Sequence, residues 1–150
     1  MIIRHWRSIV AAAVLLSAGL PVTAQSGKAF KARLSPVPVD LTMTPTVAGS
    51  GAITAVLTGN KLTISGTFEG LKSPATIAQV HKGPIAGVRG PVVFDLAVSK
   101  GTSGTISGSA DLTPLQLTDL EKRRLYVQLH SEKAPDGNLW GWLVVQESKK

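Results

Sequence analysis

Short runs of alternating apolar and polar residues constrain the fold of this chain more than any other feature. In residues 124–131 the apolar side chains of Leu125, Val127 and Leu129 alternate with Tyr, Gln and His, which is the two-residue period of a half-buried strand. Similar short runs follow one another from residue 28 to the end of the chain, and turn-forming residues separate them. This pattern favours an all-β domain built around one core.

The runs predict eight strands, over residues 28–34, 52–58, 61–69, 76–82, 92–98, 102–110, 124–131 and 139–146. Gly59-Asn60 lies between two of them and is a hairpin signal, because such turns need positive φ. Residues 102–110 alternate only small and polar side chains, which indicates a weak or edge strand. About eight short strands in one domain predict a Greek-key β-sandwich, since that connection lets two sheets cover one core.

Two segments interrupt the strand pattern. Thr113 is a good N-cap and Pro114 suits the first helical position, so we predict one short helix over residues 114–122. Residues 35–50 contain three prolines and read as an irregular connector.

The first 24 residues have the pattern of a secretory signal peptide. Arg4 and Arg7 precede an apolar stretch over residues 9–20, and small residues lead up to a cleavage site after Ala24. The stretch is shorter than the roughly 20 residues that span a bilayer, although a retained anchor is the alternative. We therefore expect a secreted or periplasmic protein with no transmembrane segment after cleavage. Its parts would be an N-terminal segment (25–29), one domain (30–146) and a basic tail (147–150).

The chain contains no cysteine, which excludes disulfides, thiolate metal ligands and cysteine nucleophiles. It also has no Gly-x-Ser-x-Gly motif and no carboxylate pair that stands out as an acid–base couple. We predict that the protein is not an enzyme.

The basic residues do not indicate nucleic-acid binding. Removing Arg4 and Arg7 from 16 basic residues leaves 14 against 9 acidic residues, a net charge of +5. The only tight cluster within the domain is Lys122-Arg123-Arg124, which has no interleaved aromatic residues to stack on bases. We interpret it as a solvated face, with weak attraction to an anionic surface as the alternative.

Two histidines could share a metal ion. On strand 76–82, Gln79 and His81 point to the same side, and on strand 124–131 the alternation turns His130 outward, away from the core. If the two strands are neighbours, His81 and His130 could hold copper or zinc, with Gln79 adding an amide oxygen and Asp95 or Glu132 a carboxylate. The alternative is that both imidazoles are ordinary solvent-exposed histidines.

Two tryptophans on the last strand suggest an interaction surface. Leu139, Gly141 and Leu143 form the apolar set that faces the core, which turns Trp140 and Trp142 outward. Tyr126 lies beside them if strands 124–131 and 139–146 form a hairpin. Such a cluster points to an interface with an unknown protein or envelope component, unless the helix or the 35–50 connector covers it.

Four segments in order resemble the CHRD family, named after chordin. They are Phe30-Lys31-Ala32-Arg33-Leu34; Gly51 to Leu57 with Leu62-Thr63 and Gly70-Leu71; Ala78 to His81 with Gly87 to Leu96; and Leu125 to His130 with Pro135 to Leu143. The resemblance implies a β-sandwich module of immunoglobulin-like or superoxide dismutase-like type, found in extracellular and exported bacterial proteins. In chordin it belongs to a protein that binds growth factors.

The resemblance also bears on the histidines. The family's His-x-His strand and its later histidine are similar to the copper ligands of copper-zinc superoxide dismutases, and His81 and His130 match the second and the later of these. The first histidine of the pair is Gln79 here, so superoxide dismutation is not expected and any copper should bind weakly. The prediction is an exported, non-enzymatic binding or structural module, with weak copper or zinc binding as the alternative.

Overall fold

The computed structural model describes residues 26–147. The predicted leader with its cleavage site after Ala24, and the last three residues of the predicted basic tail, lie outside the described residues. The elements in chain order are β1 (Lys28–Pro36), β2 (Ser50–Thr58), β3 (Lys61–Glu69), β4 (Ala75–Lys82), β5 (Val92–Val98), β6 (Gly104–Asp111), α1 (Pro114–Glu121), β7 (Leu125–Ser131), β8 (Ala134–Trp142) and β9 (Val144–Val145). Within residues 26–147, no helix combines the length and apolar character needed to cross a bilayer.

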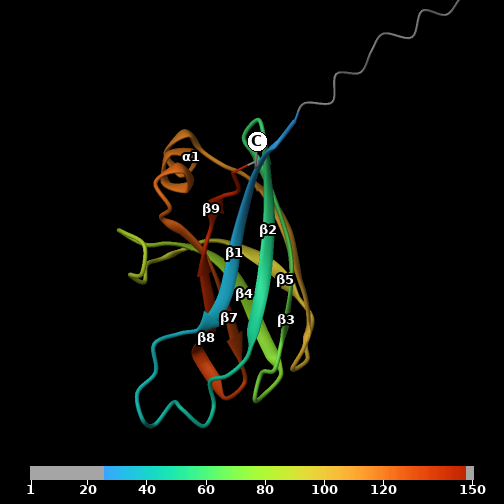
Figure 1. The fold of residues 1–150 in the computed structure, drawn as a ribbon, viewed down its shortest axis with the longest axis vertical. Helices are drawn as coiled ribbons and strands as arrows, with labels where there is room; N and C mark the ends of the chain where they lie inside the picture. Colours follow the sequence, from blue (N-terminus) through green and yellow to red (C-terminus); the bar gives the residue numbers. More distant parts are fainter. Residues whose placement is uncertain (1–25, 148–150) are drawn as a thin grey trace, which may run out of the picture.

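The strands form a closed barrel in which all neighbours are antiparallel (Figure 1). Around the barrel the order is β1-β2-β3-β6-β5-β4-β7-β8, and β8 pairs with β1 again through Ser35–Trp140 and Pro36–Leu139. The short β9 continues the line of β8 beside β1. The pairing is shortest between β5 and β6 and between β1 and β8, which share two positions each, whereas β2 and β3 share nine. The pairing of β9 adds two further positions along β1.

The all-β class and the single short helix are confirmed, but the two-sheet Greek-key sandwich is not, because the strands close into a barrel. Of the two alternatives for residues 102–110, the edge strand is wrong, since β6 lies between β3 and β5. The weak strand is consistent with the two-position pairing of β6 with β5. The small residues of β6 instead leave space for side chains of the neighbouring strand. A Cβ on Gly108 would lie 2.7 Å from Cδ2 of Leu96, so the glycine makes room for a core side chain of the neighbouring strand.

The barrel interior is filled by the inward-facing residues of the alternating pattern. Leu125, Val127 and Leu129 are fully buried, as their spacing predicts. The other large, fully buried aliphatic and phenylalanine side chains are Phe30, Leu34, Ile53, Leu62, Ile64, Ile106, Leu120, Leu139 and Leu143. Removal of this apolar surface from water is the main force that stabilises the barrel, which has no disulfide.

The start of β8 differs from the sequence prediction. The predicted strand over residues 139–146 begins earlier in the structure, because the chain turns at residues 132–133 and β8 begins at Ala134. Gly137 lies within the strand with φ 130°. A Cβ at this position would lie 2.6 Å from Nε2 of Gln128, so the glycine allows Gln128 of β7 to pack against β8.

The connector between β1 and β2 is irregular, as predicted, and it covers part of the barrel's outer surface. Val37 and Val47 pack with Ala134 of β8 in a small hydrophobic cluster, against which Met43 and Trp140 also lie. This cluster lies apart from the barrel core and shields one end of β8 from solvent.

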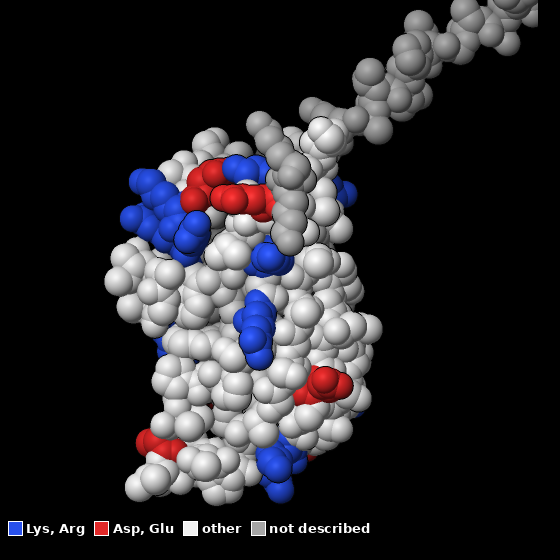
Figure 2. Space-filling model, in the orientation of Figure 1, with Lys and Arg blue, Asp and Glu red and all other residues white. Residues whose placement is uncertain are grey.

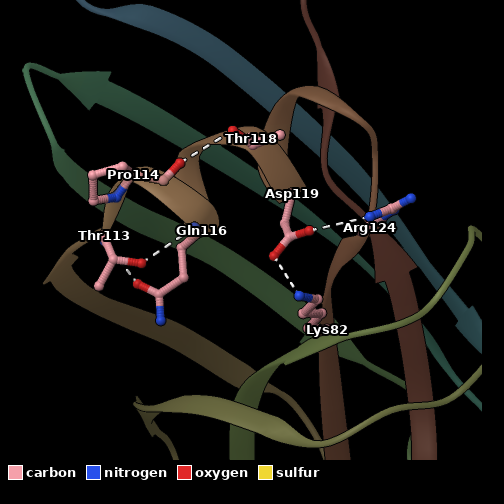
Figure 3. Close-up of polar contacts among 7 residues, drawn as sticks. All are labelled: Lys82, Thr113, Pro114, Gln116, Thr118, Asp119 and Arg124. Atoms are coloured by element: carbon pink, nitrogen blue, oxygen red, sulfur yellow. Dashed lines mark hydrogen bonds and ion pairs between the residues drawn. The ribbon is translucent and has the colours of Figure 1, made fainter.

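The helix is held at both ends by polar contacts (Figure 3). Thr113 and Gln116 form a capping box, in which the Thr113 hydroxyl accepts from the Gln116 backbone and the Gln116 side chain accepts from the Thr113 backbone. Near the other end, the buried carboxylate of Asp119 lies 2.8 Å from Nζ of Lys82 and 3.5 Å from Nη1 of Arg124. These ion pairs fix the helix to the ends of β4 and β7.

Candidate functional site

The predicted site residues gather on the outer face of β4, β7 and β8. The strand register places two rows of residues across these strands: His81–Tyr126–Trp142 and Gln79–Gln128–Trp140. His130 follows Gln128 on the same face of β7. The alternation in the sequence therefore predicted the correct face for the two histidines, Gln79 and the three aromatic residues.

His81 is buried beneath the loop formed by residues 83–91, which corrects the prediction of a solvent-exposed imidazole. Only 8% of His81 is exposed. Its Nδ1 lies 3.0 Å from the carbonyl oxygen of Gly90, and the Gly90 N–H donates to the Tyr126 hydroxyl at 3.0 Å. A Cβ on Gly90 would overlap the carbonyl oxygen of Lys82, so the loop can approach this closely only at a glycine.

His130 lies at the rim of the same site and is partly exposed. Its ring centroid is 6.3 Å from that of His81, with the ring planes inclined by 33°. Its Nδ1 lies 2.7 Å from the carbonyl oxygen of Pro135, and its Nε2 lies 3.3 Å from Nε2 of Gln128. The structure thus brings together the two histidines that the sequence assigns to separate strands.

Gln128, rather than Gln79, is the glutamine in contact with a histidine. The Gln79 amide donates to Oδ1 of Asp95 on β5 at 2.8 Å, so two of the proposed additional ligands are bonded to each other. Glu132 is exposed in the β7–β8 turn. Gln128 is buried and contacts His130, and its Oε1 has no hydrogen-bond partner among the described residues.

The hydrogen bonds fix which nitrogen of each imidazole carries the proton. A carbonyl oxygen only accepts, so Nδ1 is the donor in both His81 and His130 and the neutral rings keep a lone pair on Nε2. The Nε2 of His81 is buried without a partner within residues 26–147. Burial lowers the pKa of His81 below its usual value of 6.5. The Gly90 bond opposes this shift, while the charges of His130 and Arg89 add to it.

The donor atoms fit a weakly held transition-metal ion rather than a closed structural site. In the described part of the chain, no group of three or more His, Cys, Asp or Glu side chains could hold a metal. The possible donors are the Nε2 atoms of His81 and His130 and the amide oxygen of Gln128. The Nε2 of His81 has no partner among the described residues, whereas a metal ion would have to replace the Gln128 amide at the Nε2 of His130. Imidazole suits copper and zinc, but a closed zinc site takes four protein ligands, so a metal here would keep open coordination positions.

Tyr126 links the histidines to the tryptophans. Its ring stacks on His81 with centroids 5.1 Å apart, and on Trp142 with centroids 4.7 Å apart. Trp140 meets Trp142 edge to face at 4.6 Å. Tyr126 itself is only 1% exposed, which corrects its assignment to an interaction surface, because the loop and the tryptophans enclose it.

The two tryptophans are half-buried and have different surroundings. Trp140 is covered by the connector cluster, and the Arg89 guanidinium lies 5.7 Å from its ring centre. Trp142 lines an open groove of about 530 Å³, together with Lys31 and Arg33 of β1. Figure 2 shows basic side chains in a line over β1 on this face. The alternative that the connector covers the aromatic pair thus holds for Trp140.

The whole barrel, with this face, follows a known family pattern. The family model of the CHRD domain matches residues 30–143, from β1 to the residue after β8. The chain belongs to the CHRD domain family. No curated protein and no solved structure matches this CHRD domain.

Sequence reasoning missed three residues of the CHRD domain site: Gln128, Arg89 and Gly90. A signal for Gln128 was present, because it shares the outward side of β7 with His130. Arg89 and Gly90 lie in a loop, where no periodicity indicates the direction of a side chain. Their contacts with Trp140 and His81 come from the path of the loop across the strands.

Proposed function

We propose that this CHRD domain is an exported, non-enzymatic binding module, and that its ligand is a copper ion held between His81 and His130. The family assignment supports a binding or structural role. The leader-like pattern of residues 1–24 and the lack of cysteine support export.

The buried Nε2 of His81 is the observation that carries this proposal. A buried polar atom without a partner costs about 1–3 kcal/mol, so proteins seldom retain one that serves no purpose. This nitrogen carries a lone pair, and its ring lies 6.3 Å from the ring of a second histidine with the same tautomer. A metal ion bound to both Nε2 atoms would satisfy it. The lowered pKa of His81 helps, because protons compete less for that nitrogen at neutral pH.

Copper is the preferred metal because divalent copper binds nitrogen ligands more tightly than its first-row neighbours, zinc included. The non-enzymatic role is supported by the partners of the imidazoles. Both Nδ1 atoms bond to backbone carbonyls, whereas catalytic histidines are typically oriented by a carboxylate toward a nucleophile.

Copper titration of the chain without its leader tests the proposal. The only tryptophans in that chain are Trp140 and Trp142. The stack from His81 through Tyr126 to Trp142 places a bound copper ion close enough to quench tryptophan fluorescence. We expect saturable quenching that His81→Ala or His130→Ala abolishes. The matched control Gln79→Ala should bind as the parent does, because its amide is bonded to Asp95. Absence of saturable binding, or unchanged binding in both histidine variants, would contradict the proposal.

A second candidate function is binding of an anionic envelope polysaccharide in the groove beside Trp142. The groove combines a half-exposed indole with the cations Lys31 and Arg33. Retention on immobilised polygalacturonate, lost in Trp142→Ser and Arg33→Gln, would support it. Equal retention of the parent and both variants would exclude it.

A further inference from the structure

The loop formed by residues 83–91 exposes apolar side chains at its tip. It projects from the barrel below the helix and is the yellow-green protrusion in Figure 1. Ile85 is 62% exposed and Val88 is 42% exposed, and Pro84, Ala86 and Gly87 beside them are also exposed. The tip therefore presents five consecutive residues without a polar side chain to the surroundings.

The tip is a tight turn rather than a loose strand connection. The N–H of Val88 donates to the carbonyl of Ile85, and Gly87 has φ +87°, as the third residue of a type II turn requires. Ile85 and Val88 are the first and last residues of this turn, so their backbones lie close together at the tip.

The base of the loop is anchored to the barrel. Lys82 donates from its backbone to the carbonyl of Pro91, and Gly83 donates to the carbonyl of Arg124 at 2.8 Å. Gly90 is bonded to both His81 and Tyr126. These contacts hold the base of the loop against the barrel, while residues 84–88 at the tip are exposed.

Unpaired basic residues lie next to the loop. Arg124, which accepts from Gly83, follows Lys122 and Arg123 in the chain, and both of these are exposed. Neither forms an ion pair within the described residues, whereas nearby Glu121 is paired with Lys28 and Asp119 with Lys82. Figure 2 shows basic side chains gathered beside the helix, next to the uncharged surface of the protrusion.

We infer that this loop docks the CHRD domain on the surface of an anionic phospholipid bilayer. Ile85 and Val88 would enter the boundary between headgroups and acyl chains, where burial of apolar area favours binding. Lys122 and Arg123 would lie at the level of the phosphates, where each basic residue adds about fivefold to the affinity. Charge and apolar tip occur together at one end of the molecule, which is the arrangement that a peripheral membrane contact needs. The tip residues Ile85 and Val88 are not among the proposed copper ligands, although Gly90 at the base of the same loop bonds to His81.

Co-sedimentation with vesicles tests the inference. The chain without its leader contains the whole barrel, so it can be mixed with vesicles of phosphatidylcholine alone or with one third phosphatidylglycerol, at low ionic strength. We expect binding to the anionic vesicles only, with an affinity that falls as salt is added. The double variant Ile85→Ser/Val88→Ser should weaken binding at least tenfold, and Lys122→Gln/Arg123→Gln should do the same.

Two control variants distinguish docking through the loop from nonspecific adsorption to the vesicles. Leu41 is 93% exposed and lies in the connector at the far end of the barrel, so Leu41→Ser should bind vesicles as the parent does. The exposed Lys61 and Lys100 serve as the matched charge control, as Lys61→Gln/Lys100→Gln. Failure of the parent chain to bind anionic vesicles at low salt would overturn the inference. So would parent-like binding by the Ile85→Ser/Val88→Ser variant.

Discussion

His81 and Tyr126 stack on each other and bond to the same residue of the overlying loop. Their rings are nearly parallel, at 19°, with centroids 5.1 Å apart. His81 bonds to the carbonyl of Gly90, and the Tyr126 hydroxyl accepts from the N–H of Gly90. The position of the loop, the burial of the imidazole and the orientation of its free nitrogen are therefore determined together.

Removal of the Tyr126 hydroxyl should loosen this arrangement. In Tyr126→Phe the stacked ring remains, but the Gly90 N–H loses its acceptor. A partly buried donor left without a partner costs about 1–3 kcal/mol, so we expect the free energy of unfolding to fall by about that amount in urea titrations. A loss below about 0.5 kcal/mol would show that water replaces the hydroxyl and that the bond does not hold the loop.

The stability of the metal-free chain should decrease in mild acid because of His81. Its pKa in the folded state is lowered below 6.5, mainly by burial. The unfolded chain therefore takes up this proton at higher pH than the folded chain does, and the free energy of unfolding rises with pH in that interval. Stability should be highest above pH 6.5 and fall as the pH drops through that value. Urea titrations at a series of pH values should show that the free energy of unfolding depends less on pH in His81→Gln than in the parent chain. The same pH dependence in both proteins would contradict the lowered pKa of His81.

The buried carboxylate of Asp119 should contribute more to stability than the exposed ion pair between Glu121 and Lys28. Asp119→Ala leaves Lys82 and Arg124 without their shared partner. Because both cations are about one-third exposed, we expect a loss of about 2 kcal/mol rather than the larger cost of a fully buried pair. The matched control is Glu121→Ala, which breaks the exposed pair with Lys28 and should cost less than about 0.5 kcal/mol. Equal losses in thermal unfolding would contradict the distinction.

The N-cap of the helix should contribute measurably to stability. Thr113→Ala removes the side-chain acceptor of the Gln116 N–H and half of the capping box, at a cost of about 1 kcal/mol. Thr113→Ser keeps the oxygen and should be nearly neutral. Chemical denaturation of the three proteins checks this, and a Ser variant as weak as the Ala variant would show that the Thr113 methyl group, not the cap, stabilises the helix start.

Local patterns predicted most of the elements, but not the way the barrel closes. The predicted 61–69 and 92–98 strands and the helix start at Pro114 match β3, β5 and α1, because alternation and capping depend only on neighbouring residues. Closure depends on the pairing of Pro36 with Leu139, which are far apart in the chain. No local pattern encodes that contact, and a sandwich and a barrel share the same inward and outward alternation.

Only part of the candidate site could be predicted from the sequence. Alternation identified the face that carries His81 and His130, but it could not show that a loop buries one of them. The choice between Gln79 and Gln128 depends on the register of β4 against its two neighbours. That register shifts between Val80 and His81 on the β5 side only. In the regular pairing before this shift, Gln79 lies opposite Asp95 and bonds to it.

The two-position pairing between β5 and β6 should make this the first place where the barrel opens, because the equally short pairing between β1 and β8 is continued by β9. Backbone amides along the rest of these two strands lack partners across the gap, so local fluctuations there break few hydrogen bonds. Amide protons facing that gap should exchange with deuterium long before those shared by β2 and β3, whose pairing covers nine positions. Unfolding would then begin where β5 meets β6, while β4, β7 and β8 keep their packing until the last cooperative step.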